Sequence, residues 1–426
     1  MKKRAHTAAI HYGIIVLALI VLSVFSSLGL ARFGYTSILP AMQEGLGLSN
    51  TQTGELQTLN LIGYLLTVVF AGMLAARYGP RIVISVSLLV VSLSMILTGL
   101  VPGFGAACIS RFFAGIGGAG GNVPAMGLVS AWFGTRRRGL ASGIGVSGSS
   151  LGLIVTGPLI PAIQNVYGPD GWRVSWYVIG VLGLAAFALC ALFLRNRPGE
   201  KGLQPLGDSE NETAQRSTEN ISAALNWGLV YKSRMLWQLA AIYFAFGFAY
   251  IIYATFFVRH LVKEGAFTPA GAGSLWMKVG IVSLVSGFIW GSISDRFGRR
   301  IALLCVFTLQ GISFAVFGLS HDLTAIYFSS VLFAITAWSI PALMAALAGD
   351  AFGPRLAPAA LGLMTIIFGI GQAMGPYVAG MLADATQSFS PAFVIAGAVS
   401  LLLGAGGSLV LRTTEVLSQQ SSRKRV

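Results

Sequence analysis

The chain has 426 residues, of which 55% are hydrophobic and only 10% are charged, and its mean hydropathy is +0.77. Because soluble domains carry roughly 25% charged residues, this composition excludes an ordinary water-soluble protein. The net charge of +14 would fit nucleic-acid binding by its sign, but the positions of the basic residues indicate membrane topology and no nucleic-acid partner. Three cysteines lie far apart with no C-x-x-C spacing, so we expect no disulfide framework, metal site or cofactor.

Twelve apolar runs are long enough to cross a bilayer, which requires about 20 residues. They lie near residues 12–37, 53–75, 82–101, 105–131, 138–162, 173–194, 236–258, 271–291, 301–319, 323–348, 357–382 and 389–411. Each run is predicted to be a helix, because the bilayer interior offers backbone groups no other hydrogen-bond partner. We therefore expect an all-α integral membrane protein that crosses the lipid bilayer many times.

The basic residues are distributed unequally between the predicted loops. With a cytoplasmic N-terminus, 22 of the 28 Lys and Arg residues fall on the cytoplasmic side, three fall outside and three lie within spans. The positive-inside rule therefore predicts that both termini are cytoplasmic.

One long polar stretch divides the predicted spans six to six. The expected organisation is an N-terminal six-helix bundle over 1–194, a cytoplasmic linker over 195–234, a C-terminal six-helix bundle over 235–412 and a basic cytoplasmic tail over 413–426.

The two predicted bundles share sequence features. A ten-residue segment that begins at Gly72 returns in related form at Gly291, an offset of 219 residues. Two further segments repeat at an offset of 218 residues, 157–158 with 375–376 and 29–35 with 247–253. Three repeats at nearly one offset indicate an internal duplication of six spans. Parallel six-helix halves with a site between them are a transporter architecture.

The repeated segment resembles the cytoplasmic hairpin signature of the major facilitator superfamily (MFS), found between helices 2 and 3 and again between helices 8 and 9. The matching residues are Gly72, Arg77, Gly79 and Arg81 in the first copy and Gly291, Asp295, Arg296, Gly298, Arg299 and Arg300 in the second. In that family the signature Asp and the following Arg belong to a charge network that latches the halves. Because Ala76 replaces the first Asp, the resemblance implies a stronger latch in the second half.

Two further segments resemble MFS helices. Arg111 with Gly115 and Gly117 resembles the fourth-helix motif, and Arg32-Phe-Gly-Tyr35 followed by Leu39-Pro40 resembles the first helix of a poorly characterised bacterial branch. The resemblance implies an MFS fold in a bacterial inner membrane and alternating access between two halves. We also expect a monomer.

Three cations lie inside predicted spans where no acidic residue lies at mid-depth: Arg32, Arg111 and Lys278. A cation at the centre of a membrane helix costs roughly 2.5–3.5 kcal/mol, so each needs a partner or a function. We expect Arg32 and Lys278 to bind an anionic substrate. The alternative for Arg32 is snorkelling or a capping role near the outer surface, and Arg111 is expected to pack helix 4 through backbone carbonyls.

Other polar residues within spans are candidates for the same site. Tyr35, Tyr250, Tyr253 and Asn60 are expected in one layer with the two cations, because they lie at similar depths just outside the midplane of their spans. Arg32 and Tyr250, like Asn60 and Lys278, are repeat counterparts. Asn122, Trp338 and Gln372 fall in helices 4, 10 and 11, which face the cavity in the resembled fold. The alternative for each is a hydrogen bond to a neighbouring helix.

These features predict a secondary transporter for a small organic anion, a mono- or dicarboxylate, working as a symporter, antiporter or uniporter. Efflux of drugs or neutral metabolites is the alternative within the same fold, and a non-transporting sensor or scaffold is the alternative of another class. No Ser-His-Asp arrangement or metal-ligand cluster is present in the sequence, so an enzyme is not expected.

Overall fold

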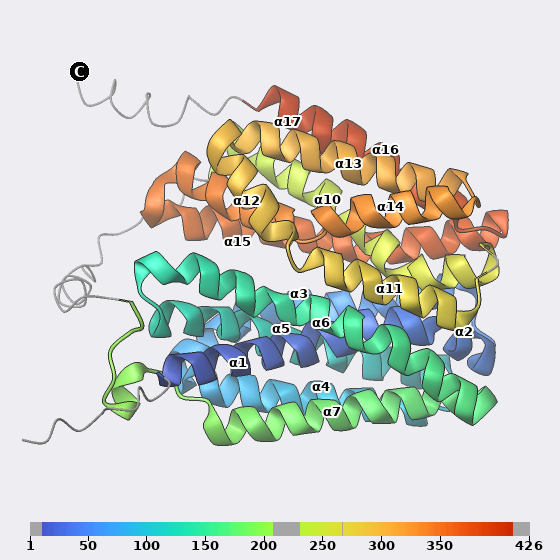
Figure 1. Cartoon of the computed structure of the whole chain (residues 1–426), viewed down its shortest axis with the longest axis horizontal. Helices are drawn as coiled ribbons and strands as arrows, with labels where there is room; N and C mark the ends of the chain where they lie inside the picture. Colours follow the sequence, from blue (N-terminus) through green and yellow to red (C-terminus); the bar gives the residue numbers. More distant parts are fainter. Residues whose placement is uncertain (1–10, 208–230, 266, 412–426) are drawn as a thin grey trace, which may run out of the picture.

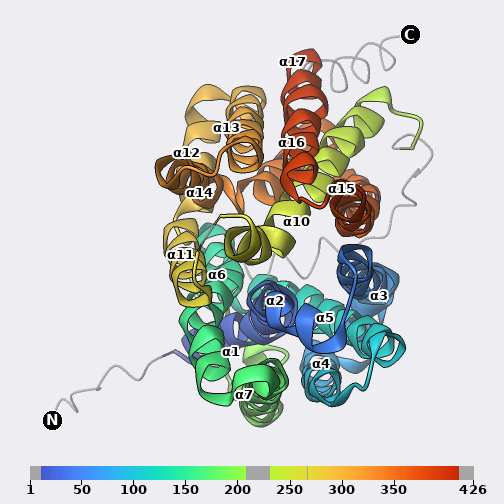
Figure 2. The same ribbon diagram turned by 90° about the vertical axis from the view of Figure 1, so that its right-hand side faces the viewer.

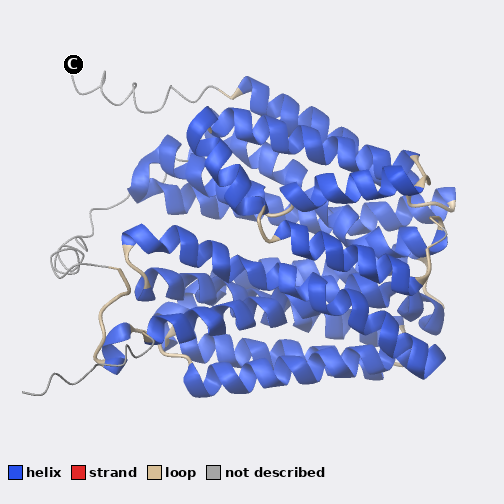
Figure 3. Cartoon of the chain, in the orientation of Figure 1, coloured by secondary structure: helices blue, strands red, loops and turns tan. Residues whose placement is uncertain are grey.

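The computed structural model describes residues 11–207, 231–265 and 267–411. Long helices form nearly all of this part of the chain (Figure 3). Within the described residues, eleven helical segments are long and apolar enough to cross a membrane. The longest of them, Arg137–Phe193, contains two helices separated by a short turn, and this division accounts for the twelve predicted spans. The predicted tail over 413–426 and most of the predicted linker lie outside the described residues.

The first half consists of seven long α-helical segments and three short turns or irregular segments. They are α1 (Tyr12–Val24), η1 (Phe25–Phe33), α2 (Gly34–Leu46), α3 (Asn50–Tyr78), α4 (Pro80–Leu100), α5 (Phe104–Trp132), α6 (Thr135–Tyr167), η2 (Gly168–Asp170), α7 (Gly171–Phe193) and η3 (Pro198–Lys201). The first span is continuous through α1, η1 and α2, and η1 is a π-helix.

The second half follows the same plan with more interruptions. It contains α10 (Arg234–Lys263), α11 (Pro269–Ser283), α12 (Ser286–Phe297), α13 (Arg299–Leu319), α14 (Leu323–Thr336), α15 (Ser339–Thr386), α16 (Ser390–Val399), η4 (Ser400–Ala405) and α17 (Gly406–Val410). Helix α15 changes direction at Gly353, where φ is 72°, so it contributes to two spans. A break between α11 and α12 likewise divides the eighth span.

The two copies of the repeated segment form equivalent hairpins. Gly79 ends α3 with φ 88° and Gly298 ends α12 with φ 92°. Because residues with a Cβ rarely adopt positive φ, glycine suits both turns. The sequence repeat therefore corresponds to a repeated backbone conformation.

The halves lie one above the other in Figure 1, the first below and the second above. Three helix pairs join them: α3 with α15, α6 with α11, and α2 with α10 (Figure 2). We call the end with the α2–α3, α10–α11 and α15–α16 connections the clamped end, and the end with the repeated hairpins the hairpin end. In Figure 1 the clamped end is at the right.

Glycines show where the halves are in contact. A Cβ on Gly54 would lie 2.1 Å from the Pro376 carbonyl oxygen, and one on Gly380 would lie 2.4 Å from that of Asn50. Both contacts join α3 to α15 toward the clamped end. At the hairpin end, a Cβ on Gly72 of α3 would meet no atom within 4 Å. The halves therefore pack closely at the clamped end and separate toward the hairpins.

Polar bonds also hold the clamped end together. The Asp384 carboxylate accepts hydrogen bonds from the backbone amides of Asn50 (2.9 Å) and Thr51 (2.8 Å), which begin α3 of the other half. Arg259 donates to Gln43, and Lys263 pairs with Glu44 at 2.6 Å. These bonds all connect residues of one half with residues of the other.

Candidate functional site

The two halves meet along a pseudo-twofold axis between α2 and α10. The Thr36 hydroxyl donates to the Ala254 carbonyl at 2.6 Å, and these residues are 218 positions apart, so each is the repeat counterpart of the other. One helical turn further from the clamped end lie Arg32 and Tyr250, which are counterparts at the same offset. The duplication thus brings the guanidinium of one half opposite the phenol of the other.

Arg32 lies in this position at the end of the π-helix η1 and is only 7% exposed. Its guanidinium carbon is 4.4 Å from the centre of the Tyr64 ring, and the Tyr250 hydroxyl is within its hydrogen-bonding range. The Arg32 Nε is buried without a hydrogen-bond partner. Because π-helical turns are rare and are often found at functional sites, this geometry favours a ligand-binding role.

Amide side chains from both halves complete the arrangement. Asn122 on α5 donates to the Tyr64 hydroxyl at 3.0 Å, and Gln372 on α15 donates to the Tyr250 hydroxyl. We call Arg32, Tyr64, Asn122, Tyr250 and Gln372 the central cluster. It combines one guanidinium, two phenols and two amides between the halves.

An aromatic wall lies beside the cluster in the second half. Phe246 stacks on Tyr250 with ring centres 4.5 Å apart, and Phe368 stacks on Tyr243 at 4.4 Å. On the other side, the Trp338 ring lies 5.4 Å from that of Phe33, next to Arg32 in sequence. These rings would exclude water from a ligand held by the cluster, which strengthens each electrostatic contact there.

Trp338 also connects the halves by a hydrogen bond. Its indole nitrogen donates to the Ser150 hydroxyl at 2.9 Å, and Ser150 is 2.9 Å from the Ser283 hydroxyl. Trp338 therefore contacts both halves near the cluster.

Two of the predicted tyrosines lie elsewhere. Tyr35 is fully buried in the first half, where its hydroxyl donates to the Thr53 carbonyl at 2.8 Å. Its counterpart Tyr253 is fully buried in the second half, 2.9 Å from the Ser329 hydroxyl and among phenylalanine rings. The expectation that they share a layer with Arg32 is not met, because each hydroxyl bonds a partner inside its own half.

The predicted pair of Asn60 and Lys278 also lies apart from the cluster. The Asn60 amide donates to the Arg111 carbonyl at 3.1 Å, inside the first half. Lys278 is exposed on α11, with its ammonium 5.5 Å from the centre of the Tyr327 ring on α14. Asn60 faces α5, the fourth span, and Lys278 faces α14, the tenth span, so each contacts a helix of its own half. The duplication makes these positions equivalent but does not bring them to the axis.

Arg111 has its bonding groups directed at the interior of the first half. It is fully buried, and it donates to the Ala31 carbonyl at 2.8 Å and to the Gln57 side chain at 2.9 Å. Its guanidinium also lies 4.6 Å from the centre of the Tyr35 ring. These contacts tie α5 to η1 and α3 and leave Arg111 inaccessible to a ligand.

Ion pairs among the described residues lie at helix ends and not at the central cluster. They join Asp170 to Arg173, Glu44 to Lys263, and Arg299 to Asp295 and Asp350. Glu264 lies 3.4 Å from the His260 ring. Within that part of the chain, therefore, no carboxylate pairs with Arg32.

The two hairpins differ in their polar contacts. In the second, Arg299 bonds both Asp295 and Asp350, and Arg300 donates to the Leu409 carbonyl. In the first, Ala76 is exposed, and Arg81 donates to the Ala191 carbonyl through Nε at 3.1 Å and Nη2 at 2.6 Å. The remaining cations, Arg77 and Arg296, each lie over the ring of the next residue, at 5.2 and 5.5 Å.

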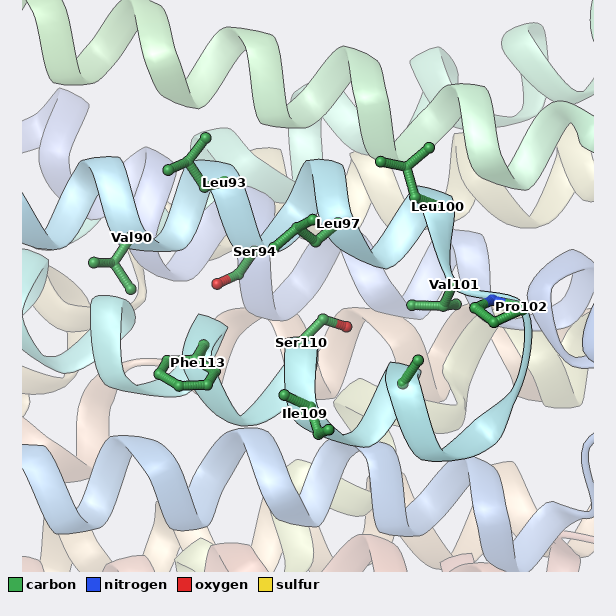
Figure 4. A pocket seen from close by; sticks show the side chains of 11 residues that line it. Val90, Leu93, Ser94, Leu97, Leu100, Val101, Pro102, Ile109, Ser110 and Phe113 are labelled. Atoms are coloured by element: carbon green, nitrogen blue, oxygen red, sulfur yellow. The ribbon is translucent and has the colours of Figure 1, made fainter.

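Two cavities lie away from the cluster. One, of about 550 Å³, is a groove between α4 and α5 whose lining is apolar apart from Ser94 and Ser110 (Figure 4). The other, also about 550 Å³, adjoins the second hairpin and includes Arg299, Arg300 and Asp350. The apolar groove offers little to orient a polar substrate and suits a lipid chain.

Tyr64 and Asp384 were not among the predicted site residues. Tyr64 supplies the ring beneath Arg32, and the available signal was a tyrosine in the middle of an apolar span. Asp384 joins the halves. The sequence around a single acidic residue near a span end does not indicate which backbone amides that residue will bond.

Two repeated bundles around a polar cluster, with one end clamped, define a secondary transporter of the MFS class. The chain belongs to the MFS_4 family, described as uncharacterised MFS-type transporter YbfB, whose model matches residues 24–408. This is a family of transporters and not of enzymes.

Known proteins resemble the chain over nearly its whole length. The probable sulfoacetate transporter SauU of Cupriavidus necator is 26% identical, with 90% of this chain and 89% of that protein covered. The hexuronate transporter of Bacillus subtilis is 24% identical, with 85% of this chain and 86% of that protein covered. A bacterial homologue of the human lysosomal transporter Spinster, solved in an inward-facing conformation, superposes with a TM-score of 0.75 at 18% identity, covering 96% of this chain and 99% of that one. The solved structure supports the fold alone.

Proposed function

We propose that this protein transports a small organic anion through alternating access, with Arg32 as the residue that binds the anionic group. The supporting observation is a buried guanidinium between the halves that has an unpaired Nε and no carboxylate partner in the described chain. An anion supplied by the substrate would compensate this charge, and charge-assisted hydrogen bonds are the strong ones. The names of the two curated relatives, for sulfoacetate and hexuronate, support the same class.

The remaining cluster residues have complementary roles in this proposal. Tyr64 and Tyr250 offer hydroxyl groups, and Asn122 and Gln372 hold those hydroxyls in place. Trp338 forms one side of the site next to Phe33. Because Arg32 and Tyr250 come from different halves, a bound anion would influence how the halves approach each other.

The direction in which the site opens follows from the charge asymmetry of the loops. We propose that both termini and the hairpin end are cytoplasmic, as the positive-inside rule predicts. The clamped end then faces outward, and the present conformation opens inward. The membrane is proposed to be the bacterial inner membrane. Since the cluster contains no acid, proton coupling through a site carboxylate is not proposed, and the substrate could carry its own proton.

Uptake into proteoliposomes tests this proposal with matched variants. We expect Arg32→Gln to weaken the apparent affinity for an accepted anion by about tenfold or more, because a charge-assisted bond contributes roughly 1.5–3 kcal/mol. Lys278→Gln also removes one membrane cation, but it lies outside the cluster and should leave uptake within about twofold. Unchanged uptake by Arg32→Gln at equal expression would contradict the assignment. Uptake of neutral sugars or drugs but of no acid would favour the efflux alternative.

A further inference from the structure

Resting on this proposed function, we infer that the central cluster selects organic anions with a single negative charge and disfavours dianions. The charge that the site accepts depends on the number of cations that can reach the substrate. In the cluster that number is one, the guanidinium of Arg32, which is surrounded by uncharged donors and acceptors.

The two other membrane cations do not supply a second contact. Arg111 is fully buried behind the cluster, and its two terminal nitrogens bond the Ala31 carbonyl and Gln57. Lys278 is exposed and lies over Tyr327 on α14. Arg111 adds positive potential, which favours anions in general, but it offers no donor to a second carboxylate.

A second negative charge would therefore be placed among neutral groups. The Tyr64 and Tyr250 hydroxyls accept hydrogen bonds from Asn122 and Gln372, and the nearby stacked rings of Phe246 and Phe368 offer no polar group. Burying a charge without a partner is costly, whereas burying a substrate hydroxyl beside a phenol or amide is not. The site thus suits a monocarboxylate or monosulfonate, including one that carries hydroxyl groups.

The two curated relatives span both charge classes, since a hexuronate carries one negative charge and sulfoacetate carries two. Similarity alone leaves the choice between these classes open. The single guanidinium of the central cluster favours the first.

Competition with chemically matched pairs tests the inference. The probe pairs are hexuronate with hexarate, monomethyl succinate with succinate, and 2-hydroxyethanesulfonate with sulfoacetate. Each pair is measured at about pH 7.5 on the full-length protein in nanodiscs and proteoliposomes. Within the best accepted pair, we expect the monoanion to bind at least about tenfold more tightly than the dianion. Equal or tighter binding of the dianion would overturn the inference and leave the proposed anion transport intact. Rejection of every acid would overturn both.

A gain of charge provides a second test. Gln372→Lys would add an ammonium beside Tyr250 and Arg32, and we expect it to lower the monoanion-to-dianion affinity ratio by about tenfold. Gln372→Met, of similar size, removes the amide without adding charge and should lower affinity for both members of a pair without changing their ratio. If Gln372→Lys binds the monoanion but leaves the ratio unchanged, the charge-matching argument fails. If that variant does not fold, the matched pairs on the unmodified protein still decide the question.

Discussion

Arg32 and Arg111 are both buried arginines of the first half, but their surroundings differ. The Nε of each is unpaired, but both terminal nitrogens of Arg111 are bonded and two aromatic faces surround it. Arg32 instead lies at the boundary between the halves, and no carboxylate of the described chain pairs with it. The first pattern stabilises a fold. The second leaves a charge uncompensated until a ligand arrives, which is the state expected of a binding residue.

This difference predicts opposite effects on stability. Arg32→Gln should raise the melting temperature of the empty protein by about 2–4 °C, since removing an uncompensated charge is worth about 1 kcal/mol or more. Arg111→Gln should lower it, because the Ala31 carbonyl and Gln57 lose their donors. Thermal unfolding in detergent measures both. Equal destabilisation by the two variants would show that Arg32 is also a structural residue.

Glu264, just beyond the end of α10, gives a pH-dependent contribution at the clamped end. Burial by itself would raise its pKa. His260 at 3.4 Å and hydrogen bonds from the Phe389 amide and the Ser388 hydroxyl outweigh burial and lower the pKa to about 2. A lowered pKa means that the carboxylate stabilises the folded state at pH above the unfolded value of about 4.5, and that this stabilisation is lost as pH falls toward 2.

We therefore expect Glu264→Gln to lower the melting temperature at pH 7, and the difference from the unmodified protein to shrink between pH 4.5 and the lowest pH at which the protein remains soluble. The thermal unfolding temperature across this range is the measurement. A difference that does not change with pH would mean that the charge of Glu264 contributes nothing.

At the scale of elements, helix α3 depends on the other half for part of its N-terminal cap. Ser49 caps the Gln52 amide within the first half, while Asp384 accepts from the Asn50 and Thr51 amides. A carboxylate at a helix N-terminus also interacts favourably with the helix dipole. The cap is therefore complete only when the clamped end is closed.

Asp384→Asn should weaken this closure. The amide keeps the shape of the side chain but loses its charge, so we expect the closed clamped end to lose about 1 kcal/mol, or about fivefold in its population relative to the opposite state. Distances between spin labels on the α2–α3 and α15–α16 connections would report the shift. As a control, Asp170→Asn changes an acid outside the clamp and should leave the distances unchanged. An unaltered distance distribution in Asp384→Asn would contradict the role of the cap.

At the scale of the whole molecule, the two hairpins are equivalent in backbone and unequal in charge. The second contains the Asp295–Arg299–Asp350 network, while the first presents Ala76 to solvent. Since alternating access requires the hairpin end to close in turn, we expect the charged hairpin to have the larger influence on that closure.

We expect Asp295→Asn to lower the transport rate about tenfold or more through the conformational equilibrium, and Ala76→Asn to change it by less than about twofold. Initial uptake rates at equal expression test this, together with unchanged substrate affinity in binding measurements. Equal tolerance of both substitutions would contradict the unequal latch.

The sequence predicted the architecture because its signals are local or periodic. The apolar runs, the two glycine hairpins at 79 and 298 and the 218-residue offset each follow from what a bilayer and a duplicated bundle require. The offset also paired Arg32 with Tyr250, and the structure places that pair at the axis between the halves.

The membership of the site could not be predicted in the same way. Depth in the membrane was the basis for placing Lys278, Asn60, Tyr35 and Tyr253 in one layer with Arg32, but depth says nothing about the direction of a side chain around its helix. Asn60 on α3 and Tyr253 on α10 lie within uninterrupted helices, and their hydrogen-bond partners belong to their own halves.

By itself, then, the sequence determined a duplicated twelve-span membrane protein, because hydrophobicity and repetition are properties of the chain. Only the tertiary structure decided that Arg32 faces Tyr250 and Gln372 while Lys278 faces Tyr327. The physical reason is that α2 and α10 meet at the pseudo-twofold axis, so repeat counterparts whose side chains face that axis come together. Helices further from that axis pack their counterparts against separate neighbours.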